Sequence, residues 1–363
     1  MFERYYPGQN IMLASSPKDG EVKKINLSPE KLKWVDYHDV KCYPDLLAWV
    51  KSHNVNRVLM HSAFYGNVRF AAFLKEHIQC KIYWLFWGFE LYNALGEDLG
   101  VSYVDEKVSI LKPRTFGYPS RIKHYLRKIK YGINYIDVLK DVKEIADYFC
   151  FWNKCDYDLY VKYFGDKVKY KFFAYSSRFR DNDIQESYVF PEKAQIVIIN
   201  HQASATGNHI TLIKKMREID PEREFSVCMP LSYGSRSIRK YCLRVGKQAF
   251  KSAFHPILTY MPREEYFNVI GKAQVALFGQ KRQEASGNIS RLLTLGTKVF
   301  LREENPLLKY YRDKGYIIYS FEKDLKQISD LSPLTEKQKI HNKKTWYRTC
   351  SYYDDFMPLF FND

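Results

Sequence analysis

The sequence lacks several features, and each absence excludes a class of protein. No apolar run approaches the roughly 18 to 20 residues that a helix needs to cross a bilayer, and the opening residues MFERYYPGQN lack the apolar core of a signal peptide. The seven cysteines show no CxxC spacing, which favours reduced thiols over a disulfide framework or a zinc site. No RNP, KH, zinc-finger or helix-turn-helix signature is present. We therefore expect a cytoplasmic protein that does not bind nucleic acid.

Acidic residues are too few to balance the basic ones. The chain has 41 Asp and Glu against 57 Lys and Arg, which gives a net charge of +16. Such a charge indicates an acidic partner. Nucleic acid, anionic lipid head groups and sugar nucleotides are all acidic, and the missing signatures argue against the first of them. Its 363 residues exceed one typical core and suit two domains, and 46% apolar with 27% charged residues is typical of a soluble globular protein.

Apolar patterns alternate between strand and helix along the whole chain. In the first part we expect strands at 11–14, 57–61, 81–87, 148–152 and 168–174, with helices at 46–51, 64–77 and 142–146. In the second part we expect strands at 195–199, 225–231, 257–260, 274–278, 298–301 and 316–319, with helices between them. This alternation predicts an α/β protein with parallel sheets covered on both faces.

Composition shifts divide the chain into domains. A polar, charged stretch separates the two series of strands, and it ends at Phe190-Pro191. The predicted divisions are a first domain at 1–177, a linker at 178–194, a second domain at 195–334 and a terminal stretch at 335–363 that packs back across both domains.

The segment 274–306 has the pattern of an anion-binding corner. The apolar strand Val275–Phe278 is broken by Gly279, and Ser286, Gly287 and Asn288 then open a helix for which Gly296 is a left-handed cap. Free N–H groups and the positive end of the helix dipole favour a phosphate there, and two cations precede the helix, Lys281 and Arg282. An ordinary turn with a solvated basic tip is the alternative.

The segment 195–210 repeats this pattern. Its strand ends at Asn200, a loop of small and polar residues follows, and Thr206 to Asn208 are candidate N-caps. Ligands of parallel sheets settle at the carboxyl ends of strands, so the two corners can face one ligand.

At these residues the chain resembles the N-acetylfucosaminyltransferases of glycosyltransferase family 56. The matching residues are Asn200, Thr206, Asn208, His209, Pro230, Tyr233, Gly234, Arg282, Gln283, Gly287, Ile289, Leu292, Leu293, Gly296, Asn305 and Pro306, together with Trp87 to Tyr92 in the first half. The resemblance implies the GT-B fold, two Rossmann-like domains facing across a cleft, with the acceptor on the first and the nucleotide on the second. It also implies transfer of 4-acetamido-4,6-dideoxygalactose from a dTDP-sugar to a polyprenyl-linked disaccharide, lipid II of enterobacterial common antigen. Residues 202–205 and 284–286 depart from the family pattern, which leaves another donor sugar open.

Chemistry and resemblance together predict the site residues. Glu90 follows the strand 81–87 and is the candidate base that takes the acceptor proton, while capping a helix or pairing with a cation is its alternative. The leaving diphosphate gains negative charge, which helix N-termini, cations and hydroxyls can stabilise. The predicted nucleotide-sugar contacts are Asn200, Thr206, Asn208, His209, Tyr233, Arg282, Ser286, Gly287, Asn288, Glu304 and Asn305.

Two acidic pairs imitate the DxD metal element of some glycosyltransferases. The pair Asp156 and Asp158 lies at a predicted helix start, and the pair Asp181 and Asp183 lies in the charged stretch between domains. Neither directly follows a buried strand, so we interpret them as helix capping and solvated linker. We predict no metal and no cofactor beyond the donor substrate.

The segment 107–136 predicts a membrane contact. It contains eight Lys or Arg and no acidic residue, and apolar residues recur in it at helical spacing. The cations of this amphipathic helix are Arg121, Lys123, Arg127, Lys128 and Lys130. Such a helix binds an anionic lipid surface, and a cationic outer face of a domain helix is the alternative.

The sequence thus predicts a GT-B glycosyltransferase, peripheral on the inner face of the bacterial plasma membrane. A soluble acceptor in the same fold stays open. A protein of another class, which binds polyanions without catalysis, stays open as well.

Overall fold

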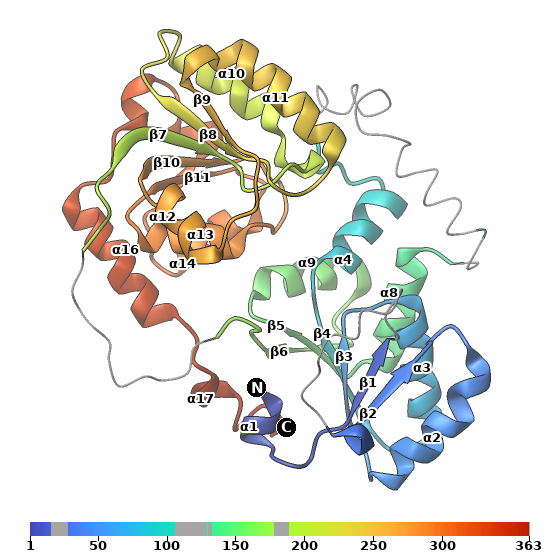
Figure 1. Ribbon diagram of the computed structural model, residues 1–363. Coiled ribbons are helices and arrows are strands. Elements are labelled where there is room, and N and C mark those ends of the chain that lie inside the picture. The colour runs from blue at the N-terminus through green and yellow to red at the C-terminus, as the bar shows by residue number, and fades with distance from the viewer. Residues whose placement is uncertain (16–27, 106–128, 130–132, 178–188, 363) are drawn as a thin grey trace. The chain divides into compact units, whose positions relative to one another are not determined.

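The computed structural model describes residues 1–15, 28–105, 129, 133–177 and 189–362 (Figure 1). The chain forms two compact units. The first comprises Met1–Asp98, Gly132–Asp181 and Ser351–Asp363, and the second comprises Leu99–Tyr131 and Asn182–Cys350. Each has its own parallel sheet, which confirms the predicted α/β class. In the described part of the chain, no helix combines the length and apolar character that crossing a membrane requires.

The first unit contains a four-stranded parallel sheet in the order β3-β4-β5-β6, and a separate parallel pair, β1-β2. The strands are β1 (Met12–Ser15), β2 (Leu32–Val35), β3 (Arg57–His61), β4 (Lys81–Leu85), β5 (Tyr148–Phe151) and β6 (Lys169–Phe172). The helices are α1 (Phe2–Tyr5), α2 (Tyr43–Ser52), α3 (Tyr65–His77), α4 (Phe89–Asn93), α8 (Tyr135–Ile145), α9 (Lys154–Phe164) and α17 (Tyr353–Phe356). Single turns are η1 (Pro29–Lys31), η2 (Val40–Cys42) and η3 (Ala94–Asp98).

Both ends of the chain cover one face of this sheet. The inward-facing side chains of β4, Tyr83 and Leu85, are fully buried. They pack with Phe2 from α1 and with Met357 and Phe360 beyond α17. The burial of these apolar side chains therefore ties the terminal segments to the first unit.

The second unit contains a six-stranded parallel sheet in the order β12-β11-β10-β7-β8-β9. The strands are β7 (Ala194–Ile199), β8 (Ser226–Pro230), β9 (Phe254–Ile257), β10 (Ala273–Phe278), β11 (Lys298–Leu301) and β12 (Tyr319–Ser320). The helices are α10 (His209–Ile219), α11 (Arg236–Phe250), α12 (Arg263–Ile270), α13 (Ser286–Thr294), α14 (Pro306–Asp313), α15 (Phe321–Asp324) and α16 (Glu336–Thr349). Short turns are η4 (Ala205–Gly207), η5 (Lys251–Ala253) and η6 (Ile328–Leu331).

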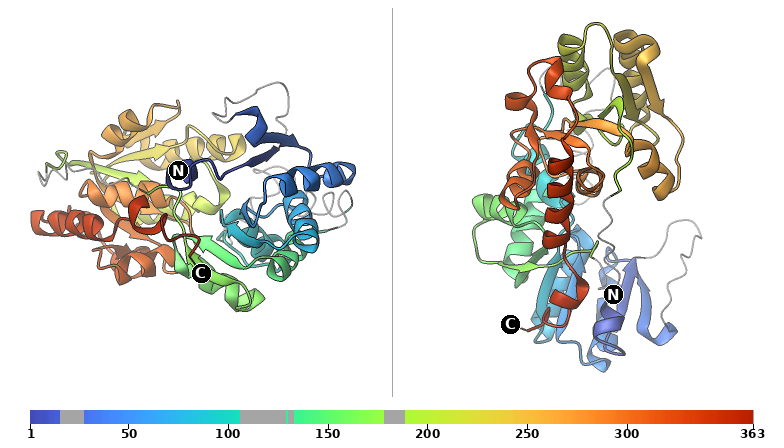
Figure 2. Two further views of the ribbon diagram at one scale, coloured as in Figure 1. Left: turned by 90° about the horizontal axis from the view of Figure 1, so that it is seen from below. Right: turned by 90° about the vertical axis from the view of Figure 1, so that its left-hand side faces the viewer.

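Helices cover both faces of this sheet (Figure 2). Apolar side chains of α10, α11 and α15 form one continuous core with β7, β8 and β10. On the other side, α13 packs on β11 and α16 packs on α13. Every residue of β10 is buried, because this central strand has a neighbour at each edge and a layer on each face.

The strand order reverses between β7 and β10. From this pair, β8 and β9 extend to one side while β11 and β12 extend to the other. Such a reversal is a topological switch point, where ligands of open parallel sheets bind beyond the carboxyl ends of the strands. The two predicted corners follow the two strands that meet there.

Several predicted boundaries differ from the observed ones. The strand expected at 257–260 lies at Phe254–Ile257 and includes Pro256, which an edge strand tolerates because its N–H is not needed for pairing. The expected strand 316–319 is reduced to Tyr319–Ser320, and β2 was not predicted.

The division into units also differs from the predicted domains. Residues 99–105 group with the second unit, although the prediction placed them in the first. The stretch 335–363 divides, since α16 belongs to the second unit and α17 to the first. Most of the predicted linker, 178–188, lies outside the described residues.

The close approach at the switch point gives a stability prediction. A Cβ atom added to Gly279 would lie 2.1 Å from the carbonyl oxygen of Gly207. Because that neighbour is backbone, we expect Gly279→Ala to lower the free energy of unfolding by about 1–3 kcal/mol or more. At Gly287 an added Cβ meets nothing within 4 Å, so Gly287→Ala is the matched control. Urea unfolding checks this, and equal losses in both variants would contradict it.

Candidate functional site

Side-chain amides hold the two corners of the second unit together. Asn200 Oδ1 accepts from the N–H of Gly279 at 2.9 Å, and its Nδ2 donates to the carbonyl of Gly207 at 2.8 Å. Asn208 Nδ2 donates to the carbonyl of Gly279 at 2.8 Å. Both asparagines have left-handed backbone conformations, with φ of 60° and 47°, which Asn adopts more readily than most residues. The structure thus brings the predicted corners together.

These bonds change the role of three predicted contacts. The amides of Asn200 and Asn208 are occupied by backbone groups, so they position the corners and are not free to bind a ligand. Asn305 Oδ1 likewise caps α14 by accepting from Leu307 N at 3.0 Å, and its Nδ2 donates to the carbonyl of Gln280 at 3.0 Å. All three lie beside the site and support it.

The N-terminus of α13 is open. Ala285 precedes the helix with φ 64° and gives no side-chain cap. The N–H groups of Ser286, Gly287 and Asn288 have no partner in the described part of the chain, and Asn288 Oδ1 is buried without a partner as well. A Cβ on Gly287 would enter open space. Three N–H donors at the positive end of a helix dipole suit an anion, as predicted for these residues.

Two further buried polar side chains at the strand ends have atoms without a partner in the ranges that the structure describes. Gln280 is fully buried, and neither its Oε1 nor its Nε2 has a hydrogen bond. His201 is 7% exposed, and its Nδ1 is unpaired. Buried polar groups are normally satisfied, so these atoms mark room for a bound polar molecule or water. Sequence analysis missed both, although each directly follows a corner residue, Asn200 or Gly279.

Predicted phosphate ligands already hold a carboxylate. Thr206 Oγ1 donates to the two oxygens of Glu284 at 2.9 and 3.0 Å, and the Arg282 guanidinium forms an ion pair with the same group. A carboxylate and a phosphate offer the same acceptor oxygens to such donors. Glu284 therefore occupies donors that an anionic ligand could use.

A second charged cluster was not predicted. Asp105 accepts hydrogen bonds from Arg302 at 2.9 Å and from Thr211 at 2.5 Å, and Lys281 lies 2.9 Å away. Burial raises the pKa of Asp105, but the hydrogen bonds from these donors outweigh it and lower the pKa to about 2. Lys281 also pairs with Glu304 at 3.1 Å. The sequence predicted that the charge of Lys281 would attract an anionic ligand, but that charge is balanced by Asp105 and Glu304. Glu304 in turn forms ion pairs with Lys281 and Arg302.

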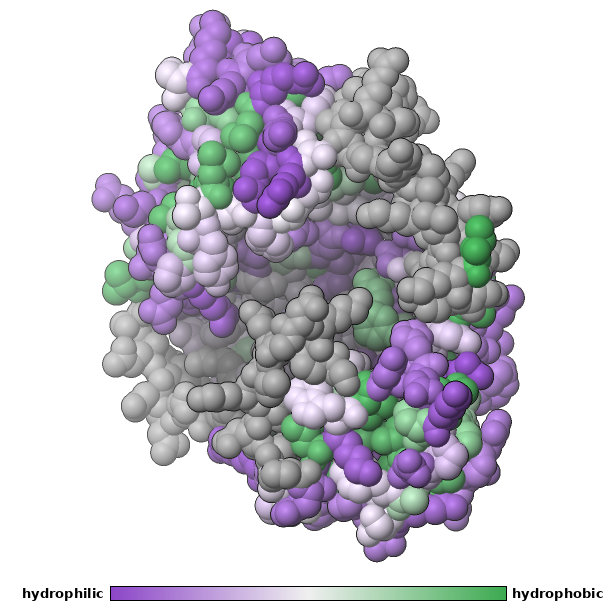
Figure 3. All heavy atoms as spheres, turned by 45° about the vertical axis from the view of Figure 1, so that its right-hand side comes forward, coloured by the Kyte–Doolittle hydropathy of each residue, from purple (hydrophilic) through white to green (hydrophobic). Residues whose placement is uncertain are grey.

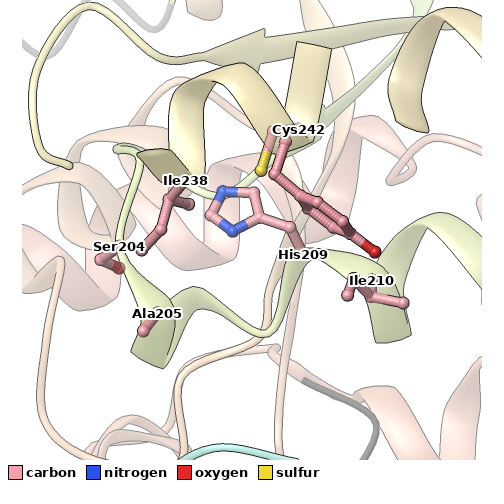
Figure 4. Close-up of a pocket in the computed structure, with 7 residues that line it drawn as sticks. Ser204, Ala205, His209, Ile210, Ile238 and Cys242 are labelled. Atoms are coloured by element: carbon pink, nitrogen blue, oxygen red, sulfur yellow. The ribbon is translucent and has the colours of Figure 1, made fainter. Parts of the chain in front are cut away.

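His209 lies in a small pocket formed with residues of α11 and of the turn before α10. Figure 4 shows its imidazole between Ile238 and Cys242. The pocket is lined by Ser204, Ala205, His209, Ile210, Ile238, Tyr241 and Cys242. Burial lowers the pKa of His209 to about 4, so the ring is neutral at pH 7. The neutral ring packs against α11, and its predicted contact with a phosphate stays a prediction. Tyr233, by contrast, is 52% exposed beside Gly234 and remains accessible.

Glu90 ties two strand ends together in the first unit. Its Oε1 accepts from Ala63 N at 3.3 Å after β3, from Trp87 N at 3.2 Å after β4, and from Trp84 Nε1 at 3.3 Å. The side chain is fully buried, and Oε2 has no partner. Burial raises the pKa of Glu90 to about 7. In this conformation the carboxyl group does not reach solvent, which favours a positioning role over direct proton transfer.

The strand ends that Glu90 holds carry an aromatic platform, formed by Phe64, Trp87, Phe89 and Tyr175. Phe64 and Trp87 are each 56% exposed. The rings of Phe64 and Phe89 lie 5.0 Å apart, and so do those of Trp87 and Tyr175. Trp87 Nε1 donates to the Tyr175 hydroxyl at 2.9 Å. Exposed, oriented rings of this kind are typical of binding sites.

The acidic pairs differ in what the structure describes. Asn153 caps α9, and the buried Asp156 accepts from Tyr92 and Asn153. Burial raises the pKa of Asp156 to about 7. The second pair, Asp181 and Asp183, lies outside the described residues, as do the predicted membrane contacts Arg121, Lys123, Arg127, Lys128 and Lys130. Within the described ranges, no group of three or more His, Cys, Asp or Glu side chains is arranged to hold a metal ion.

Comparison with known proteins identifies the fold. No protein-family model matches the sequence, and no curated protein sequence matches it. The structure resembles sucrose-phosphate synthase from Thermosynechococcus elongatus, with a TM-score of 0.59 and 11% identity over 94% of this chain and 84% of that one. It also resembles the UDP-forming α,α-trehalose-phosphate synthase from Burkholderia xenovorans, with a TM-score of 0.51 and 10% identity over 85% and 75% of the chains. Identities this low show the fold alone, and that fold is GT-B with two Rossmann-like domains, as predicted.

The burial of Glu90 predicts a stability effect that depends on pH. Between its ordinary pKa of 4.5 and about 7, the folded state keeps a proton that the unfolded state has lost, so wild-type stability falls as pH rises through this window. Glu90→Gln keeps an acceptor for the three donors and cannot ionise. We expect it to remove this loss, on the order of 3 kcal/mol, when unfolding free energies of both proteins are measured at pH 5 and pH 8.

Glu90→Ala serves as the contrast. It leaves the N–H groups of Ala63 and Trp87 buried without an acceptor, so it should destabilise at both pH values, by about 1–3 kcal/mol for each unsatisfied group. Parallel pH profiles for wild type and Glu90→Gln would show that the carboxyl group does not titrate differently on folding.

Proposed function

We propose that this chain is a glycosyltransferase that takes its sugar from a nucleoside-diphosphate donor bound to the second unit. The observation that carries the proposal is the open N-terminus of α13 at the switch point, where three N–H groups and Asn288 Oδ1 have no partner among the described residues. A diphosphate is the anion that fits the chemistry, because its oxygens accept from several N–H donors together. The similar structures support it, since two of them are named as sugar-phosphate synthases and one is named as UDP-forming.

The transfer breaks the bond between the sugar carbon and the diphosphate and forms a bond from that carbon to the oxygen of an acceptor hydroxyl, which gives its proton to water. Negative charge then grows on the leaving diphosphate. The helix dipole and N–H groups of α13 stabilise that charge without reorganising. Arg282 adds to this once the diphosphate displaces Glu284 from it and from Thr206. In this proposal the protein groups replace a metal ion, and Tyr233 lines the base pocket.

The first unit supplies the acceptor side. We assign acceptor binding to the aromatic platform, because exposed rings at the carboxyl ends of parallel strands can stack on a sugar face. Glu90 holds the two strand ends that carry Phe64 and Trp87. It therefore acts as a positioning residue for this platform.

The finer assignment follows the resemblance to glycosyltransferase family 56. It makes the donor dTDP-linked 4-acetamido-4,6-dideoxygalactose and the acceptor a polyprenyl-diphosphate-linked saccharide in bacterial surface polysaccharide synthesis. The protein would then act at the inner face of the plasma membrane, in contact with anionic lipid through Arg121, Lys123, Arg127, Lys128 and Lys130. These statements rest on the matched residues of the sequence, from Asn200 to Pro306.

Gly287→Asp tests the donor site. The added carboxylate enters open space, and its charge favours the helix N-terminus by about 0.3–1 kcal/mol, so the fold should be kept. The same charge repels a diphosphate. In wild type, one of dTDP, UDP, GDP and CDP at a hundredfold excess over its Kd should stabilise the protein by about 2.7 kcal/mol, and Gly287→Asp should abolish that thermal shift.

Gly287→Asn is the control, because it has the size of Asp without its charge, and it should keep most of the shift. A nucleotide shift that persists in Gly287→Asp would place the diphosphate elsewhere. If a short single-stranded DNA stabilises all three proteins equally and no nucleotide does, the chain is a polyanion-binding protein instead.

Trp87→Ala tests the acceptor side. Loss of one stacking ring costs about 0.5–1.5 kcal/mol, so the acceptor KM should rise up to about tenfold while the thermal shift with the nucleotide stays unchanged. Trp34→Ala is the control, since Trp34 is an exposed tryptophan of the same unit, on β2. The measurement is release of nucleoside diphosphate at varied acceptor concentration. An unchanged acceptor KM would remove the aromatic platform from the site.

A further inference from the structure

Helix α11 of the second unit carries a row of unpaired cations, which we name the α11 stripe. The stripe consists of Arg236, Lys240, Arg244, Lys247 and Lys251. The spacing of i, i+4, i+8 and i+11 places the first four on one face of the helix, and Lys251 follows directly after its last residue. All five side chains are exposed. No ion pair joins any of them to a carboxylate in the described part of the chain, and the 15 residues of α11 include no Asp or Glu.

The opposite face of α11 explains why the stripe points outward. Ile238, Cys242, Gly246 and Phe250 are buried at four-residue intervals, and three of them belong to the core beneath the helix. That packing fixes the rotation of α11 about its axis, and the cations consequently face solvent. The surface above α10 and α11, at the top of the view in Figure 3, is mainly hydrophilic. The stripe is therefore a rigid feature of the fold.

We infer that the α11 stripe is a docking surface for an anionic membrane. A straight row of cations on a rigid helix matches a planar layer of negative head groups, and each Lys or Arg near such a layer adds to the binding. The nearby exposed acids Glu222 and Glu224 flank Arg223, which donates to the carbonyl of Ala249 at 3.1 Å, in the last turn of α11. The cations in the first turns of α11 are thus the ones farthest along the helix from these two acidic residues.

Apolar side chains near the start of α11 favour a membrane over other polyanions. Leu258 and Tyr260 are 44% and 79% exposed and follow β9. Leu231, in the loop that leads into α11, donates to the carbonyl of Ile257 at 2.8 Å, so these side chains lie at the same end of the sheet as Arg236. An apolar residue and a tyrosine beside cations suit the interface of a bilayer. Single-stranded nucleic acid uses a series of aromatic faces along its track, and the stripe contains none.

Docking through the α11 stripe depends on the charge and exposure of its residues. It does not depend on whether the second unit binds a nucleotide sugar. It also concerns a surface separate from the predicted segment at 121–130, which lies outside the described residues. The four stripe residues of the helix itself are free of the proposed donor and acceptor contacts. Their replacement therefore separates membrane docking from catalysis.

The experiment is co-sedimentation of the full chain with vesicles of phosphatidylcholine alone and of phosphatidylcholine with phosphatidylglycerol. The wild-type protein should bind the vesicles that contain phosphatidylglycerol, and this binding should weaken as the salt concentration is raised. The test variant combines Arg236→Gln, Lys240→Gln, Arg244→Gln and Lys247→Gln, which keeps helix propensity. Its affinity for the anionic vesicles should fall about 100-fold or more. Its circular dichroism and its thermal shift with the nucleotide should match wild type.

A matched control removes the same charge elsewhere in the second unit. It combines Lys272→Gln, Lys314→Gln, Lys337→Gln and Lys344→Gln, which are exposed and lie outside α11. It should lose less than about fivefold in affinity, the effect of one charge near the membrane. Equal losses in both variants would attribute binding to net charge and overturn the inference. Three other results would also overturn the inference. The wild type could bind both kinds of vesicle equally, or the stripe variant could bind anionic vesicles as well as the wild type does. The stripe variant could also lose binding to single-stranded DNA and keep its binding to vesicles.

Discussion

The second unit depends on the close approach of two backbone turns at its switch point. Gly279 donates to Asn200 and accepts from Asn208, while an added side chain there would collide with Gly207. Strand pairing between β7 and β10 brings the turns to one edge, but it does not fix their distance beyond the strands. The asparagine amides do that, because each replaces backbone hydrogen bonds that the turns cannot make to each other. The open start of α13 is held in place by this joint.

The two units stabilise their strand ends in different ways. The first buries single carboxyl groups, Glu90 and Asp156, whose pKa values burial raises to about 7. The second surrounds Asp105 with donors that keep it ionised, with a pKa of about 2. A buried acid without a cation costs least when neutral, whereas an acid with cations and a hydroxyl is stable as a charge. Stability should accordingly respond to pH in opposite directions in the two units.

Local patterns predicted most of the strands and helices, although they missed β2 and misplaced β9 and β12, and they did not predict the partners of the side chains. The strand Lys298–Leu301, the helix beginning at Ser286 and the left-handed Gly296 follow from apolar period and cap chemistry, and the structure confirms them. The partner of a side chain depends on which distant segments of the chain meet in the fold. A local sequence pattern does not contain that information. Lys281 was predicted to serve an anion, yet it pairs with Asp105, 176 positions earlier in the chain. His209 was predicted beside a phosphate, and no local pattern indicated that its ring would lie in a pocket lined by residues of α11.

Cations of the second unit occur in two settings, paired with carboxylates near the strand ends and exposed along α11. At the proposed donor site Lys281, Arg282 and Arg302 are all paired with carboxylates, so the groups left for an anion there are chiefly uncharged N–H donors. Such donors recognise a diphosphate by geometry at short range, and salt screens them little. In the described part of the chain, α11 carries a row of exposed cations without an ion pair, and these act through the field of the whole surface. A site that must discriminate among nucleotides uses directed donors, and a surface that must only find a negative layer uses exposed charge.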